Sequence, residues 1–146
     1  LDDLAFAARR GGTRFDALGF LTGIGKLLAP GGVVAGCVNN RSSPKRWIKK
    51  ANDSPALLTI GACRKLLRRA GFADVRLFSL LPNWQSPLRL VEAEPAVAKF
   101  AFRHELERRG LHAASPAFWA RKLAVELGLY PYLEESLFFW GYRPAC

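Results

Sequence analysis

Two short apolar segments constrain the fold of this chain more than any other feature. Residues 33–38 are uniformly apolar, and residues 75–81 are apolar apart from Arg76 and Ser79. Both have the length of a β-strand, and a third segment, 136–143, is rich in the aromatic residues that strands favour. Because an apolar character on both faces is typical of strands covered by helices, we expect 33–38 to be a buried, parallel strand.

Segments with helical spacing of apolar residues alternate with these strands. Each of the four has a residue suited to begin a helix and one suited to end it. In chain order these pairs are Asp16 and Pro30, Thr59 and Gly71, Pro95 and Gly110, and Pro116 and Gly128. The order is helix, strand, helix, strand, a pair of helices, strand, which predicts an α/β fold with a mainly parallel sheet.

The composition favours one soluble globular domain. The chain has 146 residues, of which 50% are hydrophobic, and it contains neither an apolar stretch long enough for a membrane span nor a signal peptide pattern. We therefore expect a cytoplasmic protein. The cysteines lie in no Cys-x-x-Cys spacing, and we interpret Cys37, in the predicted strand, and Cys63, on an apolar helix face, as inert core thiols.

The net charge of +10 suggests an acidic partner. One hypothesis is therefore a non-catalytic basic α/β module that binds nucleic acid or an anionic surface, with Trp47 available for base stacking. This basic module would use Arg9, Arg10, Arg14, Arg41, Lys45, Arg46, Lys49 and Lys50. The basic residues of the second predicted helix are instead expected to form a solvated face: Arg64, Lys65, Arg68 and Arg69.

Two motifs resemble a known enzyme family. Residues 27–34, Leu-Leu-Ala-Pro-Gly-Gly-Val-Val, are similar to the turn before the fifth strand of class I S-adenosylmethionine-dependent methyltransferases. Residues 66–75, Leu-Leu-Arg-Arg-Ala-Gly-Phe-Ala-Asp-Val, resemble the step from helix to sixth strand in the same family, in the same order and at a similar distance. The aromatic strand 136–143 would then correspond to the antiparallel seventh strand.

The resemblance covers about residues 1–81 and 136–143 and implies the C-terminal half of a Rossmann-like, doubly wound sheet. Residues 1–4 would be the end of the fourth strand, and residues 88–130 a helical insertion between the last two strands. Residues 1–146 would then be a single partial domain. Since the sequence has no Met, we expect Leu1 not to be the first translated residue and the chain to be processed or a fragment. Open sheet edges suggest that a partner chain or a second copy covers them.

The family's cofactor loop and the acidic residue that binds its ribose would both precede Leu1. Gly11-Gly12 and Gly23-x-Gly25 do not replace that loop, because the first precedes no Rossmann-type step from strand to helix and the second lies in a predicted helix. We therefore expect the 146 residues alone to bind S-adenosylmethionine poorly or not at all. His104 and His112 flank a helix end, and we interpret them as exposed side chains, with no metal site.

Candidate site residues follow the predicted strand ends, where ligands bind in such sheets. Asp2 or Asp3 would accept a proton from the methyl acceptor or orient it, and the acceptor side would consist of Asn39, Asn40, Arg41, Asn83 and Trp84. Capping aspartates, an Asx turn and a packing tryptophan are the structural alternatives. Residues 81–87 also resemble a segment of glycan-associated methyltransferases, which suggests a glycan or small molecule as the acceptor. The residues themselves leave the acceptor open between a sugar hydroxyl, a small-molecule oxygen or nitrogen, and a protein side chain.

Overall fold

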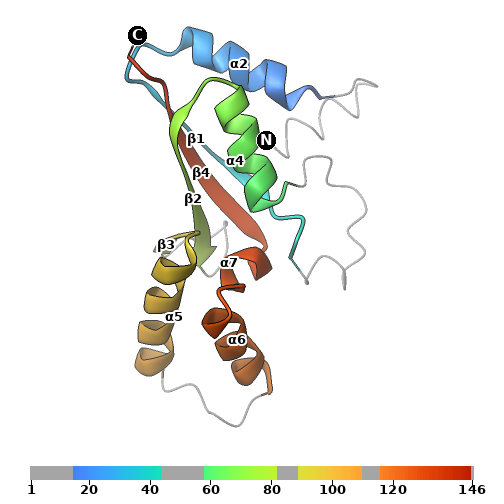
Figure 1. Cartoon of the computed structure of the whole chain (residues 1–146), viewed down its shortest axis with the longest axis vertical. Helices are drawn as coiled ribbons and strands as arrows, with labels where there is room; N and C mark the ends of the chain where they lie inside the picture. Colours follow the sequence, from blue (N-terminus) through green and yellow to red (C-terminus); the bar gives the residue numbers. More distant parts are fainter. Residues whose placement is uncertain (1–14, 44–57, 82–88, 110–115, 146) are drawn as a thin grey trace.

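The computed structural model describes residues 15–43, 58–81, 89–109 and 116–145. Helices are interspersed with strands along the chain, and the described strands form one sheet (Figure 1). Their order is α2 (Ala17–Leu27), β1 (Val33–Asn39), α4 (Ile60–Arg69), β2 (Ala73–Leu81), β3 (Arg89–Glu92), α5 (Pro95–Arg109), α6 (Pro116–Glu126), α7 (Tyr130–Leu133) and β4 (Ser136–Tyr142).

The described strands form a sheet in the order β1-β4-β2-β3, and every neighbouring pair in it is antiparallel. The expectation of a mainly parallel sheet is therefore wrong for the pairing of these strands. The reason is the position of β4: it runs antiparallel to β1 on one side and to β2 on the other, so β1 and β2 point the same way without touching. Among the residues that the structure describes, parallel pairing is limited to the isolated bridge between Asn40 and Leu58.

Strand β1 is buried on one face only. Val34 and Val38 are buried, whereas Val33 is 50% exposed and Cys37 is also exposed. The prediction of a strand buried on both faces is thus wrong. Within the described residues, α2 and α4 lie on the same face of the sheet, so the side chains that point to that face are the buried ones (Figure 1).

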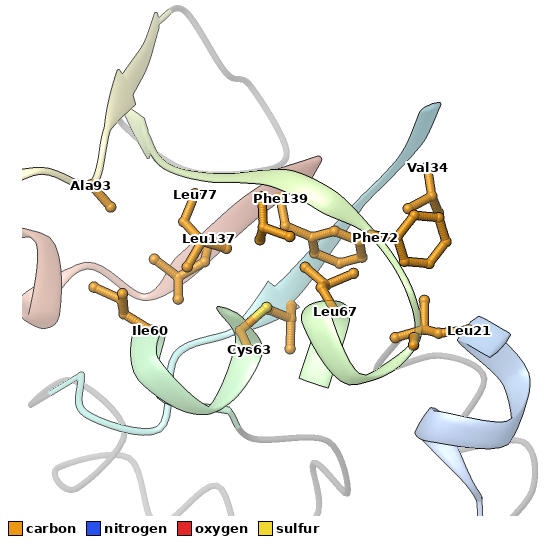
Figure 2. Packing of buried hydrophobic residues seen from close by; sticks show 13 residues of the cluster. Leu21, Val34, Ile60, Cys63, Leu67, Phe72, Leu77, Ala93, Leu137 and Phe139 are labelled. Carbon is orange, nitrogen blue, oxygen red and sulfur yellow. The ribbon is translucent and has the colours of Figure 1, made fainter. Parts of the chain in front are cut away.

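The core lies between this face and the helices. Cys63 and Leu67 of α4 are fully buried against β2 and β4, where Leu77 and Phe139 are 1% and 2% exposed (Figure 2). Leu21 of α2 belongs to the same cluster, so this helix also packs on the core. Burial of large apolar side chains is the dominant favourable contribution to folding, so this layer holds the helices on the sheet.

Two of the predicted helix starts, at Asp16 and Thr59, are confirmed by their capping hydrogen bonds. The Asp16 carboxylate accepts hydrogen bonds from the amides of Leu18 and Gly19 at 3.1 and 3.0 Å, and the Thr59 hydroxyl accepts one from Ala62 at 3.2 Å. Gly71 has a positive φ of 92° after α4, the left-handed conformation expected for a helix stop.

The two helices predicted between the last strands are present as α5 and α6. The structure adds β3 and α7, which the spacing of apolar residues does not predict. Ion pairs join α5 to α6: the Glu126 carboxylate lies 2.6 Å from the Lys99 ammonium and 2.8 Å from the Arg103 guanidinium.

Candidate functional site

The carboxyl ends of β1 and β2 lie at one edge of the sheet. Asn39, the last residue of β1, pairs with Ser136, the first residue of β4, and the Ser136 hydroxyl donates a hydrogen bond to Asn39 Oδ1 at 3.4 Å. On the other side of β4, Ser79 near the end of β2 pairs with Leu137. Helices α5, α6 and α7 gather beyond this edge (Figure 1), which we define as the carboxyl edge.

Asn40 is completely buried at this edge. Its Nδ2 donates to the carbonyls of Tyr132 and Glu134 at 3.0 and 2.9 Å, with a longer contact of 3.5 Å to the carbonyl of Pro131. Its Oδ1 accepts a hydrogen bond from the amide of Ser42 at 3.1 Å, which is the geometry of an Asx turn. The Asx-turn alternative therefore holds for Asn40, and its amide is engaged by the segment that leads into β4.

Ser43 contributes to the same contact. Its side chain is fully buried, and its hydroxyl donates to the carbonyl of Leu133 at 3.1 Å. Neither Ser43 nor Ser136 is among the site residues that the sequence predicts. The sequence signal for Ser43 was the run of small polar residues directly after the strand, whereas Ser136 only begins the predicted strand 136–143. The residues that the two serines contact lie more than 85 positions away.

The candidate residues are divided between described and undescribed parts of the chain. Asn39, Asn40 and Arg41 lie together at the carboxyl edge, where Arg41 is exposed and its backbone amide donates to the carbonyl of Leu58 at 3.2 Å. Outside the described residues lie Asp2, Asp3, Asn83 and Trp84.

The basic residues of α4 form the expected solvated face. Lys65, Arg68 and Arg69 are exposed, and Arg64 pairs with Glu94 at 2.8 Å. Of the residues considered for nucleic-acid binding, Arg41 is the one that falls within the described ranges.

The two described cysteines differ in their surroundings. Burial raises the pKa of the Cys63 thiol to about 12, so it is protonated at neutral pH and is an inert core thiol, as predicted. Cys37 is exposed, and its prediction as a core thiol is wrong because its side chain points away from α2 and α4.

Neither a metal centre nor a membrane span is found in the described part of the chain. Among the side chains described there, no three His, Cys, Asp or Glu are grouped so that they could hold a metal ion. No helix within those same ranges combines the length and the apolar character required to cross a bilayer.

Comparison with known proteins gives one distant structural likeness. No protein-family model and no curated protein matches the sequence. The crystal structure of a proposed sarcosine dimethylglycine methyltransferase from Galdieria sulphuraria is similar over 87% of this chain, with 20% sequence identity and a TM-score of 0.36. The chain spans 46% of the length of that structure.

Proposed function

We propose that this chain forms the acceptor side of a class I S-adenosylmethionine-dependent methyltransferase. The observation that carries the proposal is the position of β4, antiparallel to both β1 and β2. The motif at 27–34 leads into β1 and the motif at 66–75 leads into β2, while β4 occupies the segment expected to be the family's antiparallel seventh strand. In this proposal residues 1–146 are one partial domain of a cytoplasmic enzyme, and residues 88–130 are an insertion facing the acceptor.

The proposed chemistry requires positioning more than acid–base catalysis. The cofactor would supply an electrophilic methyl group, and the protein would hold the acceptor atom in line with it. In our proposal Asn39, Asn40 and Arg41 build the acceptor side, with Asn40 acting through the segment that it holds. Further acceptor contacts come from Asn83 and Trp84, and proton acceptance comes from Asp2 or Asp3. The acceptor is a glycan or a small molecule.

Two pairs of glycines, Gly31-Gly32 and Gly23-x-Gly25, lie in the described part of the chain. The Gly31 amide donates to the carbonyl of Arg143 and the Gly32 amide to that of Ala29, so this turn is engaged within the fold. Gly23 and Gly25 lie inside α2, where a side chain at Gly25 would meet Phe72. We therefore assign no cofactor-binding residue within the described ranges.

The test is a methyl-transfer assay on the protein as its gene encodes it, including whatever the reading frame contains before the Leu1 codon. Radiolabelled S-adenosylmethionine is supplied with polysaccharide, small-molecule and protein fractions of the source cells. We expect label in the polysaccharide or small-molecule fraction and binding of S-adenosylhomocysteine by calorimetry. A protein that binds neither cofactor form contradicts the proposal.

Matched variants separate the site from the fold. Asn39→Ala is expected to reduce methyl transfer at least tenfold and to lower the melting temperature no more than Ser136→Ala, which removes the same hydrogen bond. Arg68→Ala, on the exposed face of α4, is expected to change neither. If the loss of activity in Asn39→Ala is fully explained by the loss of folded protein, Asn39 does not belong to the site. Salt-sensitive binding to nucleic acid without methyl transfer would favour the basic-module hypothesis instead.

A further inference from the structure

Two buried polar side chains hold the segment that enters β4. Asn40 and Ser43 are inaccessible to solvent, and together they donate hydrogen bonds to carbonyls of residues 131–134. We call this contact the Asn40–Ser43 latch. It joins parts of the chain that are 90 or more residues apart.

The latch satisfies carbonyls that α7 leaves without helical partners. Helix α7 spans only Tyr130–Leu133, and the last carbonyls of a helix have no amide partner within it. Asn40 and Ser43 supply the missing donors from outside the helix. Because buried polar groups without partners are costly, the segment 131–134 is held where these donors are.

The donor side of the latch is itself held in place. The backbone amide of Asn40 donates to the carbonyl of Glu135 at 2.9 Å, as a continuation of the pairing between β1 and β4. The Ser42 amide donates to Asn40 Oδ1, and the Ser43 amide donates to the carbonyl of Asn40 at 3.3 Å. This turn fixes the directions in which both side chains point.

The acceptor side of the latch connects to the helical pair. Tyr130 and Pro131 are buried, and α7 contacts both α5 and α6. The latch therefore joins the end of β1, with Asn39 and Arg41, to the helices beyond the carboxyl edge.

We propose that Asn40 and Ser43 are positioning residues that fix α7 and its helical pair relative to the acceptor-side residues at the end of β1. The effect on methyl transfer rests on the proposed function, whereas the latch itself does not. Ser43→Ala removes one donor with a small change in volume, and Asn40→Ala removes the remaining donors. Ser42→Ala is the matched control, since Ser42 contacts Asn40 through its backbone amide.

Hydrogen–deuterium exchange of the full-length protein tests the latch. We expect amides of residues 130–136 to exchange at least tenfold faster in Ser43→Ala, with β2 unchanged and with Ser42→Ala indistinguishable from the unmodified protein. Unchanged exchange in 130–136 overturns the proposal. Equal acceleration in β2 also overturns it, because the residues would then serve the whole fold. If Asn40→Ala does not fold, Ser43→Ala decides the result.

Kinetics distinguish positioning from a purely structural role. In the methyl-transfer assay, with the fraction that accepts label as substrate, Ser43→Ala is expected to raise the KM for the acceptor at least threefold and to leave kcat and the Kd for S-adenosylhomocysteine within twofold. A kcat that falls by as large a factor as the KM rises overturns the positioning role. If the unmodified protein transfers no methyl group, the proposed function fails, and the exchange experiment still decides the latch.

Discussion

Gly36 of β1 lies directly against the ring of Phe139 in β4, its partner in the strand register. A Cβ atom at Gly36 would come within 2.8 Å of Cζ of Phe139, closer than carbon atoms in proteins approach. Phe139 is 2% exposed and belongs to the core beneath α4, so its ring has little room to move. The glycine lets the two strands pair while the ring fills the space beside them.

Gly36→Ala is therefore expected to lower the free energy of unfolding by about 2 kcal/mol, in the range measured for overpacked cores. Gly23→Ala is the control: a Cβ there meets nothing within 4 Å, and it lies inside α2, where alanine favours the helix by about 1 kcal/mol. Urea denaturation of the two variants measures both changes. A Gly36→Ala protein as stable as the unmodified chain would show that the ring of Phe139 relocates.

The local elements were predictable because they depend on nearby residues. The segments 33–38 and 75–81 match β1 and β2 within two residues at each end, and the Asp16 and Thr59 caps are present. The spacing of apolar residues did not predict the strand pairing, because the insertion of β4 between β1 and β2 is a contact between distant segments. The antiparallel direction of β4 was expected from the family resemblance alone. The one-sided burial of β1 has the same origin: small residues such as Ala35 and Cys37 are compatible with either face.

The position of the candidate site in the sequence was likewise predictable, whereas its contacts with distant residues were not. Residues 39–41 lie at the end of a strand, as predicted, but the hydrogen bonds of the Asn40 side-chain amide are determined by residues 131–134. No periodicity within 39–43 could reveal these partners. Strand β3 was missed because it is only four residues long and is formed by its pairing with β2.

Cys63 and Cys37 are expected to react very differently with thiol reagents. The raised pKa of Cys63, about 12 against an ordinary 9.0, reduces its thiolate fraction at pH 8 by about a thousandfold, and burial also blocks access. Iodoacetamide labelling followed by peptide mass spectrometry should modify Cys37 within minutes and leave Cys63 unmodified until the protein unfolds. Comparable labelling of both residues under native conditions would show that the core opens around α4.

The same pKa shift predicts a loss of stability at high pH. In the unfolded chain Cys63 ionises near pH 9, whereas in the folded protein it stays protonated until about pH 12. Its contribution to the free energy of unfolding is therefore complete below pH 9 and is lost as the pH rises toward 12. Cys63→Ala, compared with the unmodified protein from pH 8 to 11, should show a smaller decline of stability with pH. Parallel declines would contradict the assignment.

Ser79 has a buried hydroxyl for which the described residues supply no hydrogen-bond partner. Ser79→Ala removes this unsatisfied group without leaving a large cavity, so we expect the free energy of unfolding to rise by about 1 kcal/mol. Ser136→Ala is the opposite case, since its hydroxyl donates to Asn39, and it is expected to destabilise the protein. Chemical denaturation measures both variants, and a destabilised Ser79→Ala would show that its hydroxyl has a partner in solution.

Glu126 is expected to make the contact between α5 and α6 sensitive to acid. Hydrogen bonds from Lys99, which has the larger effect, and from Arg103 hold the pKa of Glu126 below its ordinary value of 4.5. A lowered folded-state pKa means that its contribution to stability is present above pH 4.5 and is lost as the pH falls through the lowered value. Since the three side chains are partly exposed, the effect should be local and should weaken with added salt.

Glu126→Gln tests this by removing the charge and retaining a hydrogen-bond acceptor. At pH 7 and low salt, amides of α5 and α6 should exchange faster in the variant than in the unmodified protein, and the difference should disappear well below pH 4.5. Glu94→Gln is the control, because Glu94 pairs with Arg64 of α4 and should leave exchange in α6 unchanged. A difference that persists after Glu126 is protonated would mean that shape, and not charge, holds the two helices together.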